Sequence, residues 1–367
     1  MPSDCDGTRV PRLAPCQDEK TPRAQQVIRP PQVPPGCIID PSAPDIAASA
    51  TAYHRTNRTN RTHLHPQRAN PTLPSTLMSG DTPPIVLTFG LSDPTGGGGL
   101  QADLLTLASM GCHGVSVLTG YTVRDSAGCD EVTGLDPETV ATQARMLLED
   151  MPVSAFKVGA GTRAEVVSAI AEVVADYDEI PLIVAPDFTL DDEHVLAADE
   201  LREVVTDLLV PQTTVLVADV SVLLALAQPD GDAEAPSIDA AISHLLSTGC
   251  EYILSMETGS HRVVNTLYSE EGQLRQDFWD RSNQPMMGLA DTLGSAIAAL
   301  LANGQEPPEA VREAQEYLYQ AVQNAFRPGM GAWMPDRFFW ARSNDAENGE
   351  ASPGDADDLP PSDEARH

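Results

Sequence analysis

The sequence predicts an α/β protein in which helices cover both faces of a mostly parallel β-sheet. From Pro84 onward, short apolar runs that are typical of buried strands alternate with longer segments of helical pattern. This alternation is typical of parallel sheets, because a helix carries the chain back to the start of the next strand. A glycine-rich turn follows the first apolar run. Since such sheets bind ligands at the carboxyl ends of their strands, we expect a ligand site at this turn.

Each element is predicted from its own pattern of apolar residues and its bounding Gly or Pro residues. Extended segments are expected at Ile85–Thr88, Gly114–Tyr121, Ala155–Val158, Pro181–Ala185, Thr214–Ala218, Tyr252–Leu254 and Val263–Tyr268. Helices are expected at Leu100–Met110, Pro137–Glu149, Arg163–Tyr177, Asp192–Leu209, Ser237–Ser247, Leu293–Ala302 and Glu309–Asn324.

Both ends of the chain differ in composition from this body. Residues 1–80 are rich in Pro, Arg, Asn and Thr, include the repeat RTNRTNRT and show no apolar periodicity. We expect a disordered segment, which is either a genuine flexible extension or a stretch that is not translated because translation starts at Met78. Residues 343–367 are rich in acids, Pro and Ser and are likewise expected to be disordered. The folded domain is therefore placed at residues 82–342.

The charge of the chain argues against nucleic acid and membrane partners. The net charge is −32, with 54 acidic and 22 basic residues, and nine of the bases lie in the first 77 residues, where they outnumber the six acids. The acidic body would repel nucleic acid and anionic membranes, because phosphate binding needs clustered Lys and Arg. We expect neither partner, and a source that tolerates salt fits such a surface.

The six cysteines and the hydropathy pattern predict a cytoplasmic protein. No two cysteines form a CxxC pair, so reduced thiols are expected. No apolar run reaches the roughly 18 residues that a membrane helix needs, and the first residues lack the order of a signal peptide.

The glycine-rich turn is the first candidate binding element. Gly96–Gly99 lie between a strand and a helix, and glycine allows the backbone to approach a ligand closely. Backbone N–H groups at the start of the helix would then face an anion. The plainer interpretation is a tight strand-to-helix connection without a ligand.

The amino-acid sequence of this turn also resembles that of a known family. DPTGGGGLQAD resembles the DPSGGAGIQAD signature of the hydroxymethylpyrimidine/phosphomethylpyrimidine kinases of thiamine biosynthesis, and the resemblance extends from Pro84 to about Trp340. It implies a single ribokinase-like domain that uses ATP and Mg²⁺. The implied reaction is phosphorylation of 4-amino-5-hydroxymethyl-2-methylpyrimidine and then of its monophosphate. A homodimer is one possible assembly of the protein.

The resemblance places the anion hole at Gly288, Leu289, Ala290 and Asp291, where the pyrimidine kinases usually have GTGC and most relatives GAGD. Successive N–H groups at a helix start would hold the transferred phosphate, and Asp291 would be the base that takes the hydroxyl proton. The other interpretation is that Asp291 only caps the helix.

The resemblance also implies residues of the substrate side. Gly98 and Asp103 match positions that approach the pyrimidine, and Lys157, the single lysine after Lys20, matches a strand end that faces the site. Arg124 stands where the family offers a Gln, and a guanidinium donates hydrogen bonds but accepts none. Asp219 stands in the segment that supports magnesium, and we expect it as the metal residue.

Three other family motifs are changed in this chain. The aspartate of a strand end is replaced by Ala185, the glutamate after Asp219 is missing, and a Gly-Gly-His segment reads Ser255-Met256-Glu257. Two alternatives to the parent activity therefore remain. One is a weak or inactive relative that binds a small ligand or a partner protein. The other is a kinase for another small alcohol, such as a pyridoxal-like compound.

Overall fold

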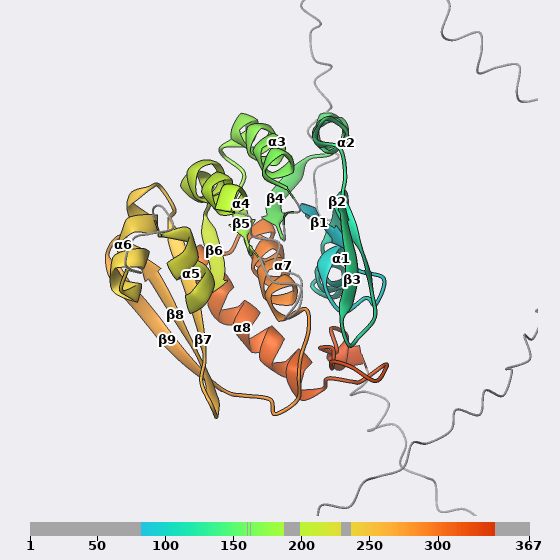
Figure 1. The fold of residues 1–367 in the computed structure, drawn as a ribbon, viewed down its shortest axis with the longest axis vertical. Helices are drawn as coiled ribbons and strands as arrows, with labels where there is room; N and C mark the ends of the chain where they lie inside the picture. The colour runs from blue at the N-terminus through green and yellow to red at the C-terminus, as the bar shows by residue number, and fades with distance from the viewer. Residues whose placement is uncertain (1–81, 160, 162, 187–198, 229–235, 342–367) are drawn as a thin grey trace, which may run out of the picture. The chain divides into compact units, whose positions relative to one another are not determined.

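The chain folds around one nine-stranded sheet flanked by helices, as Figure 1 shows. The structure is a computed structural model that describes residues 82–159, 161, 163–186, 199–228 and 236–341. Contacts divide the chain into two units, Met1–Leu77 and Met78–His367, and every described residue belongs to the second. The predictions for residues 1–80 and 343–367 lie outside the described residues.

The strands follow the order β3-β2-β1-β4-β5-β6-β7-β8-β9 across the sheet. The six central strands, from β2 to β7, pair in parallel, whereas β3, β8 and β9 pair antiparallel at the two edges. The strands are β1 Ile85–Ser92, β2 His113–Arg124, β3 Cys129–Gly134, β4 Val153–Val158, β5 Leu182–Val184, β6 Val215–Asp219, β7 Tyr252–Thr258, β8 Arg262–Ser269 and β9 Gly272–Asp280. The predicted class, a mostly parallel α/β sheet, is confirmed.

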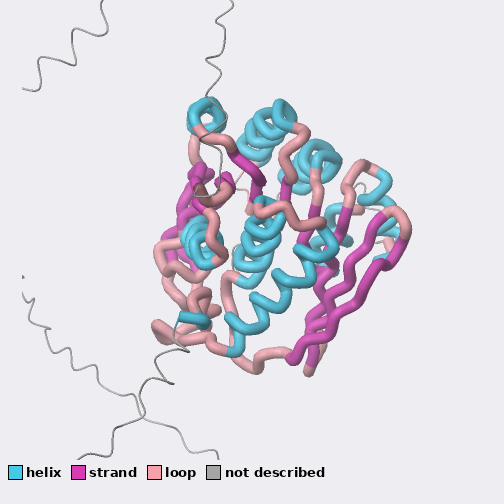
Figure 2. The backbone as a smooth tube through the Cα atoms, turned by 180° about the vertical axis from the view of Figure 1, so that it is seen from behind, coloured by secondary structure: helices cyan, strands magenta, loops and turns pink. Residues whose placement is uncertain are grey.

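Helices cover both faces of the sheet, and each face has its own apolar core. On one face α2, α3, α4, α5 and α6 pack against the strands. On the other face α7 lies between α1 and α8 (Figure 2). The α-helices are α1 Gly99–Ser109, α2 Pro137–Asp150, α3 Ala164–Val174, α4 Asp199–Val204, α5 Val220–Leu226, α6 Ile238–Ser247, α7 Leu289–Ala302 and α8 Pro307–Gln323. Shorter turns of other helix types are Ala175–Tyr177, Val205–Leu209 and Val210–Gln212.

Helix α7 occupies the centre of its face because its sequence is apolar or small all round. Every residue from Thr292 to Leu301 is buried, and a helix that is hydrophobic on all sides belongs in the interior. Gly294 contributes to the close fit, since a Cβ there would lie 3.2 Å from the Cβ of Ala185. The helix start is therefore fixed against the carboxyl ends of the strands.

Several predicted bounds are corrected by the structure. β1 and β2 run on to Ser92 and Arg124, and α7 begins at Leu289, four residues before the predicted start. Strands β3 and β9 and helix α5 are not predicted at all. Of the predicted helix Asp192–Leu209, the structure describes residues from 199 onward, where α4 continues into a π-helical turn. Among the described residues, no helix is long and apolar enough to cross a membrane.

Candidate active site

The glycine-rich turn is organised by the side chain of Asp93. One carboxylate oxygen, Oδ1, accepts hydrogen bonds from the N–H and the hydroxyl of Thr95 at 2.8 and 2.7 Å. The other, Oδ2, accepts from the N–H of Gly98 at 3.1 Å. Gly99 has φ +58°, and a Cβ there would lie 2.3 Å from the carbonyl oxygen of Leu91. Only glycine fits this position, so the turn has one well-defined shape.

A second glycine turn opens α7 on the opposite side of the same site. Gly288 is the N-cap and has φ +70°. A Cβ on Gly288 would lie 1.7 Å from the carbonyl oxygen of Gly97, so the two glycine turns pack directly on each other. The N–H groups of Leu289, Ala290 and Asp291 lie in the first turn, where the helix offers them no carbonyl partner. Free N–H groups at a helix start suit an anion, and the anion hole at this end of α7 stays a prediction.

Asp291 lies in this first turn but does not cap its own helix. The helix has no side-chain cap hydrogen bond. Instead, Asp291 Oδ2 accepts the N–H of Gly99 at 2.7 Å, which joins the starts of α1 and α7. Asp291 therefore holds the first N–H group of α1 rather than capping its own helix, and its role as the base stays a prediction.

A buried ion-pair cluster holds the other oxygen of Asp291. Lys157 Nζ donates to Asp291 Oδ1 at 2.8 Å and to the two oxygens of Asp103 at 2.8 and 3.0 Å. The hydroxyls of Thr88 and Ser295 complete the shell of Asp103, at 2.6 and 2.8 Å. The side chains of Lys157 and Asp103 are fully buried, and that of Asp291 is 22% exposed. Asp291 is thus the member of the cluster that reaches solvent.

The cluster sets the ionisation of its members. Burial would lower the pKa of Lys157, but the two carboxylates outweigh it and raise that pKa above its ordinary value. Burial would raise the pKa of Asp291, but the charge and hydrogen bond of Lys157, with the N–H of Gly99, hold it below its ordinary value. For Asp103, burial prevails and raises the pKa. Asp291 is therefore ionised at neutral pH and can accept a hydrogen bond from an alcohol.

Two pockets meet at the first turn of α7. The smaller, of about 100 Å³, has a mixed polar and apolar lining and contains Asp291 and Gly288. It is completed by Gly90, Leu91, Asp93, Gly98, Gly99, Thr122, Arg124 and Met287. The larger, of about 400 Å³, contains Leu289 and Ala290. Its wall includes the aromatic rings of Trp279 and Tyr319, whose centroids are 5.0 Å apart. One turn of helix thus separates a small pocket of mixed polarity from a larger, mainly apolar one.

The predicted site residues divide into those that line a pocket and those that lie below it. Gly98 and Arg124 line the small pocket, as expected. Asp103 and Lys157 do not line either pocket, because both side chains are enclosed beneath Asp291. Their predicted contact with substrate is corrected to an indirect one, through Asp291.

Asp219 lines the larger pocket, where its Oδ1 accepts the N–H of Val222 and the hydroxyl of Ser221. It therefore caps α5. Within the described residues, no group of three His, Cys, Asp or Glu side chains could hold a metal ion. The metal role of Asp219 stays a prediction.

Arg337 also belongs to this site, and sequence reasoning missed it. Its side chain reaches the glycine-rich turn from the end of the described chain, 240 residues away, where its Nη2 donates to the carbonyl of Gly97 at 2.7 Å. No local pattern around Arg337 marks it, because its partners are backbone groups distant in sequence.

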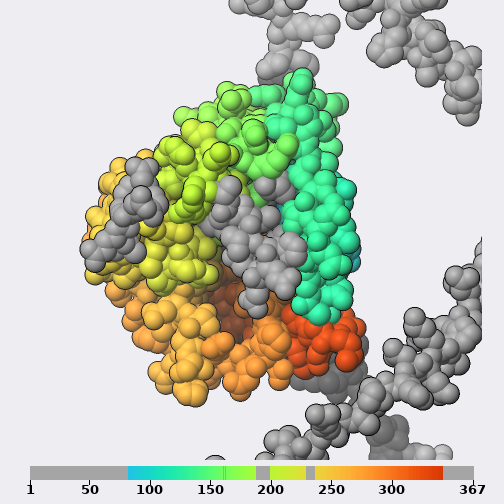
Figure 3. Space-filling view, viewed as in Figure 1, coloured from blue at the N-terminus to red at the C-terminus, as the bar shows by residue number. Residues whose placement is uncertain are grey.

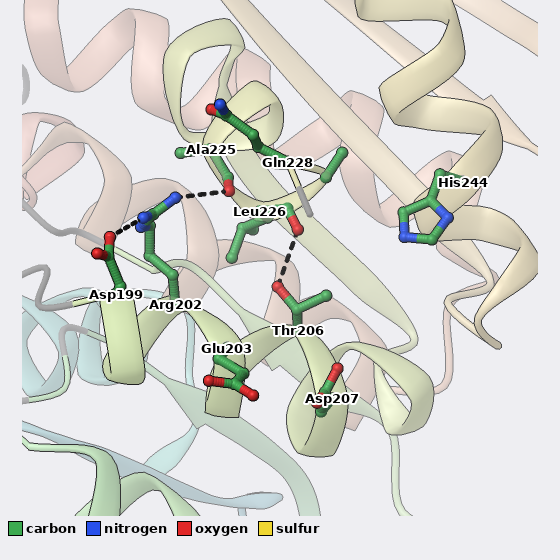
Figure 4. A pocket seen from close by; sticks show the side chains of 10 residues that line it. Asp199, Arg202, Glu203, Thr206, Asp207, Ala225, Leu226, Gln228 and His244 are labelled. Carbon is green, nitrogen blue, oxygen red and sulfur yellow. Dashed lines mark hydrogen bonds and ion pairs between the residues drawn. The ribbon is translucent and has the colours of Figure 1, made fainter. Parts of the chain in front are cut away.

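Another hollow of the described surface lies elsewhere, between α4, α5 and α6 (Figure 4). It has a volume of about 520 Å³ and is lined by polar side chains, among them Asp199, Glu203, Asp207 and His244. Arg202 in its wall is already paired with Asp199 and with the carbonyl of Ala225. This hollow has no connection with the glycine turns.

The close packing of the two glycine turns gives a direct test. Gly288→Ala is expected to lose most of its stability, because the new methyl group would clash with the Gly97 carbonyl and φ is positive. Gly96→Ala is the matched control, since Gly96 also has positive φ (+73°) but has open space around it. Thermal unfolding of both variants checks this, and equal melting temperatures would contradict it.

The fold and the two pockets define a ribokinase-like α/β protein. The pyridoxal kinase of Staphylococcus aureus, solved in complex with AMP-PCP, superposes with a TM-score of 0.63 at 23% identity over 71% of this chain and 96% of that one. The phosphomethylpyrimidine kinase of Clostridium difficile superposes with a TM-score of 0.55 at 25% identity over 65% of this chain and 99% of that one.

The sequence comparisons show the family. A model of the phosphomethylpyrimidine kinase family matches residues 93–336. A hydroxymethylpyrimidine/phosphomethylpyrimidine kinase of Streptomyces coelicolor is 36% identical over 68% of this chain and 93% of the relative. One of Synechococcus elongatus is 30% identical over 68% and 95%. The chain belongs to the phosphomethylpyrimidine kinase family, and it is a kinase, a transferase.

Proposed function

We propose that the protein transfers the γ-phosphoryl group of ATP to 4-amino-5-hydroxymethyl-2-methylpyrimidine and then to its monophosphate, two steps of thiamine biosynthesis. The observation that carries the proposal is the meeting of two pockets at the first turn of α7. The small pocket, with Asp93, Arg124 and Asp291 in its lining, suits a single substituted ring. The larger pocket, with its aromatic wall, suits an adenine base, and the helix start between them suits the transferred phosphate.

In this arrangement Asp291 orients and deprotonates the alcohol. Its carboxylate faces the small pocket, and Lys157 and the N–H of Gly99 hold it in place. The N–H groups of Leu289, Ala290 and Asp291 stabilise the negative charge of the phosphoryl group in flight. Most of the catalysis of such a transfer is positioning and charge stabilisation.

Mg²⁺ fits the larger pocket as a partner of the triphosphate. Proteins bind Mg²⁺ through one or two carboxylates together with phosphate oxygens. The carboxylates that line this pocket are Asp219 and Asp280. Asp219 uses Oδ1 to cap α5, and its Oδ2 has no hydrogen-bond partner among the described residues. Asp219 would hold the ion, which neutralises charge on the phosphates when it is bound.

One observation favours a different alcohol as substrate. The guanidinium of Arg124 lines the small pocket, with Nη1 4.0 Å from Asp93 Oδ2, which is longer than a hydrogen bond. Its Nη groups have no hydrogen-bond partner among the described residues, so they are available to an acceptor on the ligand. A guanidinium cannot accept a hydrogen bond from the amino group of the pyrimidine. A pyridoxal-like ring, which carries more acceptors, is therefore the second candidate.

An assay of product separates these functions. We expect the purified full-length protein with Mg-ATP to phosphorylate the aminopyrimidine alcohol at a higher kcat/KM than pyridoxal, with phosphorylated product read by ³¹P NMR. Product with pyridoxal alone would support the second candidate. A melting shift with the pyrimidine but no product from any alcohol would contradict both, and would indicate a relative that binds without catalysis.

A further inference from the structure

The described chain ends in a segment that contacts each of the loops around the small pocket. This closing segment comprises residues 326–341. The N–H groups of Gly331 and Ala332 donate to the Oγ and the carbonyl of Ser126, in the loop that follows Arg124. Trp333 pairs with Pro285 and Met287, directly before the anion hole. In the space-filling view the closing segment lies against the end of β2 and β3 (Figure 3).

Arg337 makes the contact between this segment and the two glycine turns. Its Nη2 donates to the carbonyl of Gly97 at 2.7 Å and its Nη1 to that of Gly96 at 3.4 Å. Its Nε donates at 3.0 Å to the hydroxyl of Thr292, which itself donates to the carbonyl of Gly288 at 2.6 Å. One guanidinium therefore connects the turn beside the small pocket to the first turn of α7.

The environment of Arg337 explains why a cation is used here. The residue is 4% exposed, and no ion pair of the described residues involves it. Its acceptors are neutral carbonyls and a hydroxyl. A buried guanidinium needs several acceptors, because each buried N–H group without a hydrogen bond costs free energy. These carbonyl oxygens lie next to the helix start that would receive a phosphate. Without a donor they would present negative partial charge to that anion.

The backbone of Arg337 is itself anchored. Its carbonyl accepts hydrogen bonds from the hydroxyls of Tyr317, at 2.8 Å, and Ser109. Tyr317 belongs to α8, and Ser109 is the last residue of α1. The guanidinium therefore extends from a fixed point, so that it can hold a turn that contains four successive glycines.

We propose that Arg337 is a positioning residue of this active site, which holds Gly96–Gly97 in register with the first turn of α7. Arg337 itself lines neither pocket in the described structure, so it acts through the glycine turns that it contacts. Its effect on catalysis rests on the proposed function, whereas its effect on the turn does not. Both effects are measurable in the same variants.

The test compares Arg337→Gln and Arg337→Lys with Arg312→Met, an exposed arginine on α8 paired with Glu309 and Glu316. By mass spectrometry, we expect amide exchange of the peptide covering residues 93–101 to become about tenfold faster or more in Arg337→Gln, with α2 unchanged. With the aminopyrimidine alcohol and Mg-ATP, the alcohol KM should rise about tenfold and the ATP KM by less than about twofold. Arg312→Met should match the wild type in both measurements.

The outcomes separate a positioning role from a general structural one. Faster exchange throughout the domain, or both KM values unchanged in a folded and active variant, overturns the inference. Wild-type exchange at residues 93–101 in folded Arg337→Gln overturns it as well. If Arg337→Gln does not fold, Arg337→Lys decides by the same criteria, because lysine keeps the charge and part of the donor set. If the wild type forms no product, the proposed function fails and the exchange measurement alone decides.

Discussion

Replacing Asp291 by Asn is expected to reduce phosphoryl transfer by about 10²- to 10⁴-fold, because the amide cannot take the proton of the alcohol. The side chain keeps its size, and its oxygen can still accept the N–H of Gly99. The ion pair with Lys157 is lost, but Lys157 retains Asp103 as a partner. We therefore expect a fall in stability of only about 1–3 kcal/mol, the usual range for a hydrogen bond to a charged group.

Asp136→Asn is the matched control for this variant. Asp136 caps α2 through the N–H of Thr139 and lies outside both pockets. Asn caps helices about as well as Asp, so activity and melting should stay at wild-type values. Turnover at saturating Mg-ATP and thermal unfolding are the measurements. A folded Asp291→Asn protein with full activity would remove Asp291 from catalysis.

The pH dependence of the rate gives an independent check on Asp291. The folded-state pKa of this carboxyl lies below its ordinary value of 3.8. A depressed carboxyl pKa contributes stability above the ordinary value, and this is lost as the pH falls through the folded-state value. Asp291 should therefore cause no loss of rate between pH 5 and pH 8, and an acidic limb near pH 6 would have to come from another group or from the substrate.

Replacing Lys157 by Met is expected to cause the largest loss of stability, about 3–5 kcal/mol, because it leaves two carboxylates close together without their cation. Asp103 is fully buried and cannot be hydrated. Since domains of this kind are stable by only about 5–15 kcal/mol, much of the protein could unfold. The expected change is measured by chemical denaturation at pH 7.

A double variant isolates the cause of that loss. Lys157→Met with Asp103→Asn removes one of the two stranded charges and should recover at least half of the lost stability. The recovery would appear as non-additivity of the two changes in a mutant cycle. If Lys157→Met unfolds at the same denaturant concentration as the wild type, the ion-pair cluster does not stabilise the fold in the way its geometry indicates.

The sequence predicts the central elements well because their patterns are local. The strand before the glycine turn, the parallel alternation and the apolar helix after Asp291 are each encoded in neighbouring residues. The edge strands are missed for a physical reason. In β9 the less exposed positions are Arg275, Asp277 and Trp279, and the first two form an ion pair at 2.6 Å, so the strand lacks a continuous apolar face.

The site is predicted less completely than the fold. Motifs identify Gly98, Arg124 and Asp291, since each lies in a segment that resembles a family motif. Motifs do not show which side chains are buried. Asp103 and Lys157 are buried whereas Asp291 reaches the pocket, and this difference depends on how α1, β4 and α7 pack together. Arg337 is missed because nothing near it in the sequence indicates that its partners lie in a glycine turn at the other end of the domain.

The single helical turn between the two pockets has a consequence for inhibitor design. If both pockets hold the ligands proposed here, one molecule could join an adenosine to the pyrimidine through a short phosphate chain laid over Leu289, Ala290 and Asp291. Linking two ligands makes the second binding event intramolecular, with an effective concentration in the millimolar range for a short linker that spans the gap. Such a compound would bind far more tightly than either half, and its optimal chain length would measure the path that the phosphoryl group travels.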